Sequence, residues 1–201
     1  MRVLSGSARS IPLKTLPDFR TRPILDRIKK SLFSILESSA LILDARVADL
    51  YAGTGTQGIE ALSRGAEWCL FVEQRPDGVA LLKENLCKTK LEAKAVVRCS
   101  TVGSVLSELI SQKNPPSSSL YDLILYDPPF MMSRDPEHRK ELESEMGLAG
   151  TLLYPGHGRL VLRFEKKAEL PTPAGLRMMR HWVDGPHAFA FYASAEHVPK
   201  R

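Results

Sequence analysis

The sequence predicts an α/β domain built on a mainly parallel sheet, with an antiparallel hairpin at its C-terminal end. Short apolar runs alternate with helical patterns along most of the chain, which is the order of right-handed β-α-β units. A glycine-rich segment follows the first apolar run, where a tight strand-to-helix turn belongs. The last two runs are joined by too few residues for a crossover, so they must pair as a hairpin.

The elements follow from the spacing of apolar residues. Residues 1–22 predict a basic arm or hairpin, with β-like pieces on both sides of a turn at 6–10. The domain proper is predicted at 23–201 and begins with a helix from Pro23, a residue that a first helical turn tolerates. Seven strands are predicted, at residues 46–51, 69–73, 95–99, 122–126, 158–164, 176–183 and 187–193. Further helices are predicted near residues 59–63, 79–91, 102–110 and 136–148.

Composition excludes several classes of protein. A chain of 201 residues with 43% hydrophobic residues is typical of one globular domain. It has no apolar run of about 18 residues that could span a membrane, and its first residues lack the apolar core of a signal peptide. Its three cysteines form no C-x-x-C pair, and its histidines show no metal-ligand spacing. We therefore expect a soluble cytoplasmic monomer without disulfides or metal.

The positive charge is concentrated at the N-terminus. The chain carries a net charge of +5, yet the segment 1–30 holds eight basic and two acidic side chains, which is +6. The rest of the chain therefore sums to −1. A basic arm on a nearly neutral body indicates binding to a polyanion such as RNA. The alternative is a solvated basic terminus that binds nothing.

The glycine-rich segment at residues 49–58 predicts a nucleoside cofactor. Its G-x-G-x-x-G pattern lets the backbone approach a ligand, although the same pattern also fits a dinucleotide or a tight turn alone. Glu73 ends the next strand, where an acid would bridge ribose hydroxyls. Asp49 can attract the ammonium of a methionine moiety and would repel a pyrophosphate, which favours S-adenosylmethionine. The predicted cofactor-binding residues are Asp49, Tyr51, Ala52, Gly53, Thr54, Gly55 and Glu73.

The segment Asp127-Pro128-Pro129-Phe130 follows an apolar strand and predicts methylation of a ring amine. Such an amine is a poor nucleophile, because its lone pair is delocalised into the ring. The Asp127 carboxylate and the Pro128 carbonyl can accept the amine hydrogens and turn the lone pair toward a methyl donor. The prolines fix φ without adding N–H groups, and stacking on Phe130 is worth roughly 1–3 kcal/mol.

The position of this acceptor motif limits which bases can reach it. A base inside a helix must be extruded or already unpaired to reach it. In a doubly wound sheet the first and fourth strands flank the switch point, so we expect the glycine loop and Asp127 to face one crevice. The alternative is a proline-stiffened strand end with Phe130 in the core.

With both motifs in place, the chain resembles the RsmD-type bacterial 16S ribosomal RNA guanine-N2 methyltransferases. The resemblance runs from Arg2 to about Phe191, and residues 59–66 are its most diagnostic stretch. It implies the three-layer class I methyltransferase fold, S-adenosylmethionine as donor and the N2 amine of one guanine in small-subunit rRNA as acceptor. It also implies that the basic arm helps to dock RNA. The matching segments are residues 2–9, 21–23, 26–29, 31–36, 49–58, 59–66 and 127–130.

The chain departs from the family pattern at three places. Ile24 stands where a threonine is usual, and Arg9-Ser10-Ile11 replaces the usual Arg-Gly-Arg/Lys. Ser100 and Thr101 are the nearest candidates where an acid or amide often holds the adenine amine. For contact with phosphate or rRNA the best candidates are Arg9, Arg22 and Arg27. Each could instead form a structural ion pair, as Arg22 could with Asp26.

The predicted function is methyl transfer from S-adenosylmethionine to a guanine N2 amine of 16S rRNA, either naked or in a partly assembled small subunit. Asp127, Pro128 and Phe130 are the predicted catalytic residues. One alternative is methylation of an adenine or cytosine amine in other RNA or in DNA. A second is an NAD(P)-dependent oxidoreductase, disfavoured because no His or Tyr–Lys pair is placed to assist hydride transfer. A third is rRNA binding without catalysis.

Overall fold

The computed structural model of the chain describes residues 1–16, 25–111 and 120–195. These residues form two compact units, Met1–Thr101 and Val102–Arg201. The predicted boundary between arm and domain, at residue 22, falls outside the described residues, so that division stays a prediction. Within the described part of the chain, no helix has the length and apolarity needed to cross a membrane.

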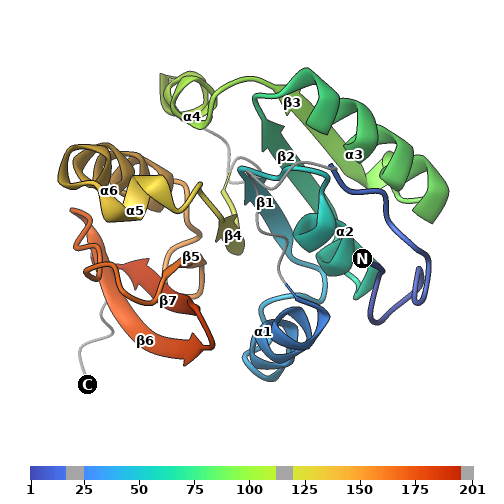
Figure 1. Ribbon diagram of the computed structural model, residues 1–201, viewed down its shortest axis with the longest axis horizontal. Coiled ribbons are helices and arrows are strands. Elements are labelled where there is room, and N and C mark those ends of the chain that lie inside the picture. The colour runs from blue at the N-terminus through green and yellow to red at the C-terminus, as the bar shows by residue number, and fades with distance from the viewer. Residues whose placement is uncertain (17–24, 112–119, 196–201) are drawn as a thin grey trace. The chain divides into compact units, whose positions relative to one another are not determined.

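The first unit is a parallel three-stranded sheet with helices packed on it (Figure 1). Its strands are β1 (Arg46–Leu50), β2 (Trp68–Glu73) and β3 (Ala95–Cys99), in the order β3-β2-β1. Helix α2 contacts β1 and β2, whereas α3 contacts β2 and β3. The helices of this unit are α1 (Asp26–Ser38), α2 (Thr56–Ser63), α3 (Pro76–Thr89) and the 3-10 turn η1 (Glu92–Lys94).

All three predicted strands of the first unit are confirmed, but two helices begin earlier than predicted. Helix α2 begins at Thr56 rather than near residue 59, because Gly55 has a φ of 79° and ends the preceding turn. Helix α3 begins at Pro76, where a proline lacks only an N–H that the first turn leaves unused. It ends at Thr89, because Lys90 adopts a left-handed conformation that stops the helix.

The second unit carries the other four strands, β4 (Leu123–Tyr126), β5 (Arg159–Glu165), β6 (Leu176–Asp184) and β7 (His187–Ser194). Strands β4 and β5 are parallel, and every residue of β4 is buried. Helices α4 and α5 both contact α6. The helices are α4 (Val102–Ser111), α5 (Met131–Arg134) and α6 (Pro136–Gly150), and α6 begins at a proline with Asp135 as its N-cap.

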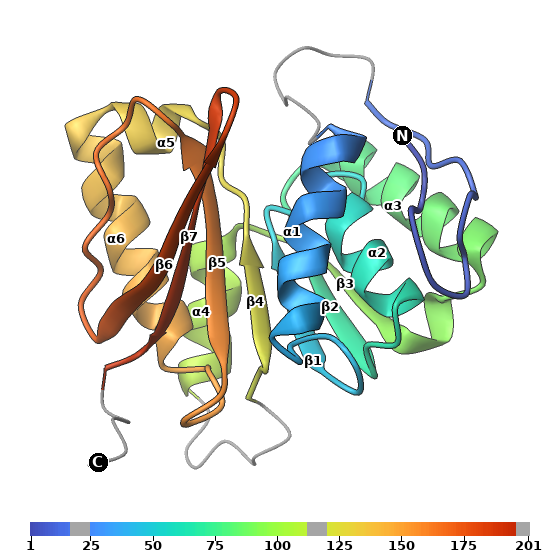
Figure 2. The same ribbon diagram turned by 90° about the horizontal axis from the view of Figure 1, so that it is seen from below.

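The predicted C-terminal hairpin is confirmed, and the structure adds the order of its two strands. Strand β7 pairs antiparallel with both β5 and β6, so the last strand of the chain lies inside the sheet and β6 lies at its edge (Figure 2). A short link only requires the two strands to be neighbours, so it could not indicate which of them inserts. The more apolar strand takes the inner position. Strand β7 is buried from His187 to Ala193, whereas β6 is mostly exposed.

The N-terminal segment 1–14 forms the predicted hairpin and is held against the first unit. The Val3 N–H donates to the Ile11 carbonyl at 3.0 Å, and Arg2 and Pro12 form an antiparallel bridge. The predicted turn is confirmed by the left-handed Ser10, which has a φ of 69°. The Ala8 N–H donates to the hydroxyl of Ser63 at 3.0 Å, which fixes the turn to the end of α2.

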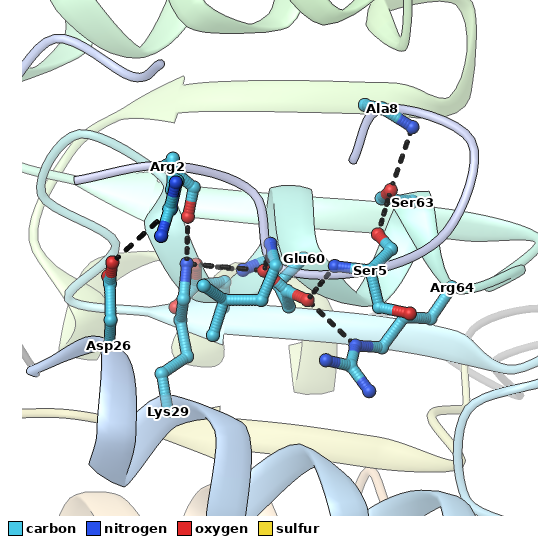
Figure 3. Close-up of polar contacts among 11 residues, drawn as sticks. Arg2, Ser5, Ala8, Asp26, Lys29, Glu60, Ser63 and Arg64 are labelled. Carbon is cyan, nitrogen blue, oxygen red and sulfur yellow. Dashed lines mark hydrogen bonds and ion pairs between the residues drawn. The ribbon is translucent and has the colours of Figure 1, made fainter. Parts of the chain in front are cut away.

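A buried carboxylate joins this hairpin to α1 and α2 (Figure 3). Glu60 accepts hydrogen bonds from the Leu4 N–H at 2.8 Å and the Ser5 N–H at 3.1 Å. It also pairs with Lys29 of α1 at 3.2 Å and with Arg64 at 2.7 Å. The side chains of Lys29 and Glu60 are both fully buried. Burial lowers the pKa of the Lys29 ammonium, while the Glu60 charge acts to raise it.

We expect Glu60→Ala to lower the free energy of unfolding by about 3–5 kcal/mol, because it leaves buried cations and amides without their acceptor. Lys14→Met is the control, since the Lys14–Glu84 pair is exposed by 60% and 52% and should contribute less than about 1 kcal/mol. Urea denaturation measures both variants. Equal losses in the two would contradict the importance of the buried network.

Candidate active site

The predicted site residues fall into two groups, one in each unit. The cofactor residues lie in the first unit, on the ends of β1, β2 and β3 and on the loop between β1 and α2. The acceptor motif lies in the second unit, directly after β4.

The loop after β1 turns through three left-handed residues. Tyr51, Gly53 and Gly55 have φ values of 63°, 56° and 79°. A left-handed tyrosine is uncommon, and such backbone strain is characteristic of functional loops. The Ala52 N–H donates to the Val72 carbonyl at 2.9 Å, which continues the strand pairing into the loop.

Only the first of the three glycines borders open space. A Cβ on Gly55 would lie 2.1 Å from Leu82 Cδ1, and a Cβ on Gly58 would lie 2.3 Å from Phe71 Cε1. Gly55 therefore lets the loop pack closely on α3, and Gly58 lets α2 pack closely on β2. A Cβ on Gly53 would meet no atom within 4 Å. Gly53 is thus the position where the backbone can approach a ligand, as the cofactor prediction requires.

Asp49 is buried and holds the start of α2. Its Oδ2 accepts the N–H of Gly58 at 2.8 Å, and only 1% of the residue is exposed. Gly58 is the third residue of α2, so Asp49 satisfies one of the N–H groups that a helix start leaves open. The proposed attraction of Asp49 for a cofactor ammonium would act from this position.

Glu73 fixes the shape of the glycine loop. Its Oε2 accepts the Gly53 N–H at 2.8 Å, and its Oε1 accepts the Arg75 N–H at 2.8 Å. Ser100 lies close by in the backbone, since its N–H donates to the Glu73 carbonyl at 3.1 Å. The carboxylate predicted to bind ribose therefore stands at the loop, in contact with Gly53, the loop glycine that borders open space.

Asn85 is a loop-positioning residue that the sequence did not single out. It is fully buried, and its Nδ2 donates to the Thr54 carbonyl at 2.9 Å and to the Lys14 carbonyl at 3.0 Å. Its Oδ1 accepts the Lys14 N–H at 2.8 Å. Asn85 therefore connects the glycine loop to the N-terminal hairpin. In the sequence, Asn85 could have been recognised only as an amide residue on the apolar face of a predicted helix.

The acceptor motif lies where the buried strand β4 ends. Pro128 is buried, whereas Asp127 and Phe130 are partly exposed. The Ser133 hydroxyl donates to the Phe130 carbonyl at 2.9 Å and steadies the turn into α5. Arg134 of α5 forms an ion pair with Glu165 of β5.

Two side chains of the second unit that sequence reasoning missed contact this motif. The Nε of Arg163 donates to Asp127 Oδ1 at 2.6 Å, and its guanidinium carbon lies 5.4 Å from the Phe130 ring centroid. The ring of His187 lies 5.6 Å from that of Phe130, tilted by 57°. Only the fold places these residues at the motif.

The three arginines predicted to bind RNA have different outcomes. Arg9 is exposed in the turn of the hairpin, and Arg27 is exposed on α1. Arg22 lies outside the described residues, as does its suggested pairing with Asp26. Asp26 Oδ2 lies 3.8 Å from the Nε of Arg2.

Comparisons with known proteins cover nearly the whole chain. Residues 1–193 match the family model "Conserved hypothetical protein 95". The chain is 32% identical over 200 residues to ribosomal RNA small subunit methyltransferase D of Haemophilus influenzae, covering 96% of this chain and 93% of that protein. It is 29% identical over 195 residues to the protein of the same name in Escherichia coli K12, covering 96% and 89%. The structure of hypothetical protein TTHA0928 from Thermus thermophilus matches with a TM-score of 0.77 and 30% identity, covering 95% and 98%.

The glycines give a test that separates packing from ligand approach. We expect Gly55→Ala to lower the free energy of unfolding by about 2–4 kcal/mol, from left-handed strain and overpacking against Leu82. Gly53→Ala should lower it by only about 1–2 kcal/mol, yet weaken S-adenosylmethionine binding at least about tenfold. Urea denaturation and titration calorimetry measure the two effects. Unchanged affinity in G53A would exclude Gly53 from the cofactor site.

Proposed function

The chain belongs to the Conserved hypothetical protein 95 family, and on that premise we propose that it methylates the N2 amine of a guanine in 16S rRNA. The expected similarity to RsmD-type enzymes is confirmed, as is the class I methyltransferase fold. S-adenosylmethionine is the methyl donor. The proposal extends to the guanine as target base, to naked rRNA or a partly assembled small subunit as substrate, and to action as a cytoplasmic monomer.

The observation that carries the proposal is the acceptor motif at the end of β4. Asp127 is held by Arg163 rather than projecting into solvent, with 13% of its side chain exposed. The Pro128 carbonyl follows it directly, and neither proline can donate an N–H that would compete for the base. The Asp127 carboxylate and the carbonyl of the adjacent Pro128 provide two acceptors for the two hydrogens of one amine.

The first unit supplies residues that fit the donor. Gly53 leaves room for close approach, and Glu73 stands at the same point of the loop. We assign the ribose hydroxyls to Glu73, the methionine ammonium to Asp49 and the adenine to the region of Ser100. Tyr51, Ala52, Thr54 and Gly55 complete the proposed loop. When bound, S-adenosylmethionine supplies an electrophilic methyl group on its sulfonium sulfur.

In the proposed mechanism the protein orients the nucleophile. Asp127 and the Pro128 carbonyl accept the amine hydrogens, which turns the nitrogen lone pair out of conjugation with the ring. Phe130 stacks on the base and fixes its plane. Alignment provides most of the acceleration. Formation of the C–N bond needs no general base, and one proton then leaves the amine to Asp127 or water.

The same chemistry would methylate an adenine or cytosine amine, so the base is the least constrained part of the proposal. The names of the relatives favour rRNA of the small subunit. Parallel assays on deproteinised rRNA and on duplex DNA separate an rRNA methyltransferase from a DNA methyltransferase. Activity on DNA alone would contradict rRNA as the substrate.

We expect Asp127→Ala to reduce the methyl-transfer rate at least about 100-fold, the scale of removing one positioned polar group. Asp122→Ala is the control, because Asp122 lies at the opposite end of β4 and accepts a hydrogen bond from His157. Transfer of labelled methyl to small-subunit particles measures both rates. Near-normal turnover by D127A would contradict the mechanism.

We expect Arg9→Ala to weaken RNA binding and to reduce the slope of log affinity against log salt by about one, the loss of one phosphate contact. Arg139→Ala serves as the control, since Arg139 pairs with Glu169 in the second unit. Fluorescence anisotropy over a salt series measures the slopes. An unchanged slope for R9A would exclude Arg9 from the RNA interface.

A further inference from the structure

We propose that Arg163 is a positioning residue that fixes the acceptor carboxylate and the stacking ring relative to each other. This inference rests on the proposed function, because it assigns Arg163 a task in orienting the target base. It goes beyond the acceptor motif itself, since Arg163 lies on β5, 36 residues after Asp127.

One guanidinium contacts both side chains that are proposed to hold the base. Its Nε donates to Asp127 Oδ1 at 2.6 Å, and its Cζ lies 5.4 Å from the centroid of the Phe130 ring. The two side chains of the ion pair are exposed by only 10% and 13%. A charge-assisted hydrogen bond that is largely shielded from water is stronger and less sensitive to salt than a surface pair.

The surroundings of Arg163 show that its charge has a specific partner. Its neighbours Leu162 and Phe164 are buried, and Phe189 lies directly opposite on β7. A cation in the middle of a buried strand is unfavourable unless it is paired and hydrogen-bonded. The contact with Asp127 provides that pairing. The same ion pair that stabilises the buried Arg163 therefore also immobilises the Asp127 carboxylate.

The planar guanidinium restricts the Asp127 carboxylate and the Phe130 ring in a way that a lysine ammonium would not. Its fork of N–H groups fixes a carboxylate in direction as well as in place, and its flat surface packs on an aromatic ring. His187 contacts the same ring at 5.6 Å, so Phe130 is held by two side chains. Displacement of a reacting group by about 1 Å can slow a reaction 100-fold, which makes this restriction matter for rate.

The test is a double-mutant cycle on the full chain. Arg163→Met, Arg163→Lys, Asp127→Ala and the R163M/D127A double variant are compared for kcat on small-subunit particles and for S-adenosylmethionine affinity by calorimetry. Arg139→Met is the matched control, because it removes another arginine ion pair from the same unit. Thermal unfolding of each variant reports on folding.

We expect R163M to lower kcat about 10- to 100-fold while S-adenosylmethionine affinity stays within about twofold. R163K should recover part of the loss, because it keeps the charge but not the planar fork. The double variant should lose far less activity than the product of the two single effects, since Arg163 acts through Asp127 as well as on Phe130. R139M should retain the activity of the original chain.

Independent effects that multiply in the double variant would overturn the inference, as would normal kcat in R163M. If R163M does not fold, the same cycle with R163K applies the same criteria. Loss of activity in D127A with full activity in R163M would refute the role of Arg163 and leave the proposed function standing. Absence of transfer by the unaltered chain would refute both.

Discussion

The glycine loop depends on buried carboxylates that accept its backbone N–H groups. Asp49 holds the third residue of α2, and Glu73 holds Gly53 and Arg75. A loop that turns through several left-handed residues cannot pair its N–H groups as a strand or helix would, and leaving them buried without acceptors is costly. The acids therefore give the loop one shape before a ligand arrives. That shape leaves Gly53 beside open space.

The same principle extends from the loop to the N-terminal hairpin. Asn85 bonds to the backbone of both Thr54 and Lys14, and Glu60 accepts N–H groups of Leu4 and Ser5. The positive charge of the hairpin is therefore displayed by an ordered element fixed to α2 and α3. A partner that binds Arg9 meets a preformed surface and does not have to order it, which reduces the entropic cost of binding.

Local patterns in the sequence predicted the fold and the two motifs. Apolar runs located all seven strands, and the prolines and glycines located the loop and the acceptor motif. Arg163, Asn85 and the Lys29–Glu60 pair could not be recognised, because each acts on a residue at least 31 positions away. A charged or amide side chain inside an apolar pattern indicates that a partner exists, but only tertiary structure identifies it. The place of β7 inside the sheet was not predicted, although the sequence of β7 is more apolar than that of β6.

Methyl transfer to guanine N2 can be tested by supplying the protein with tritiated S-adenosylmethionine and unmodified small-subunit particles, followed by nucleoside analysis of the rRNA. We expect label in N2-methylguanosine, which would establish donor, reaction and base together. Label in a methylated adenine or cytosine would contradict the assignment of the base, and failure to bind S-adenosylmethionine would contradict the cofactor site itself.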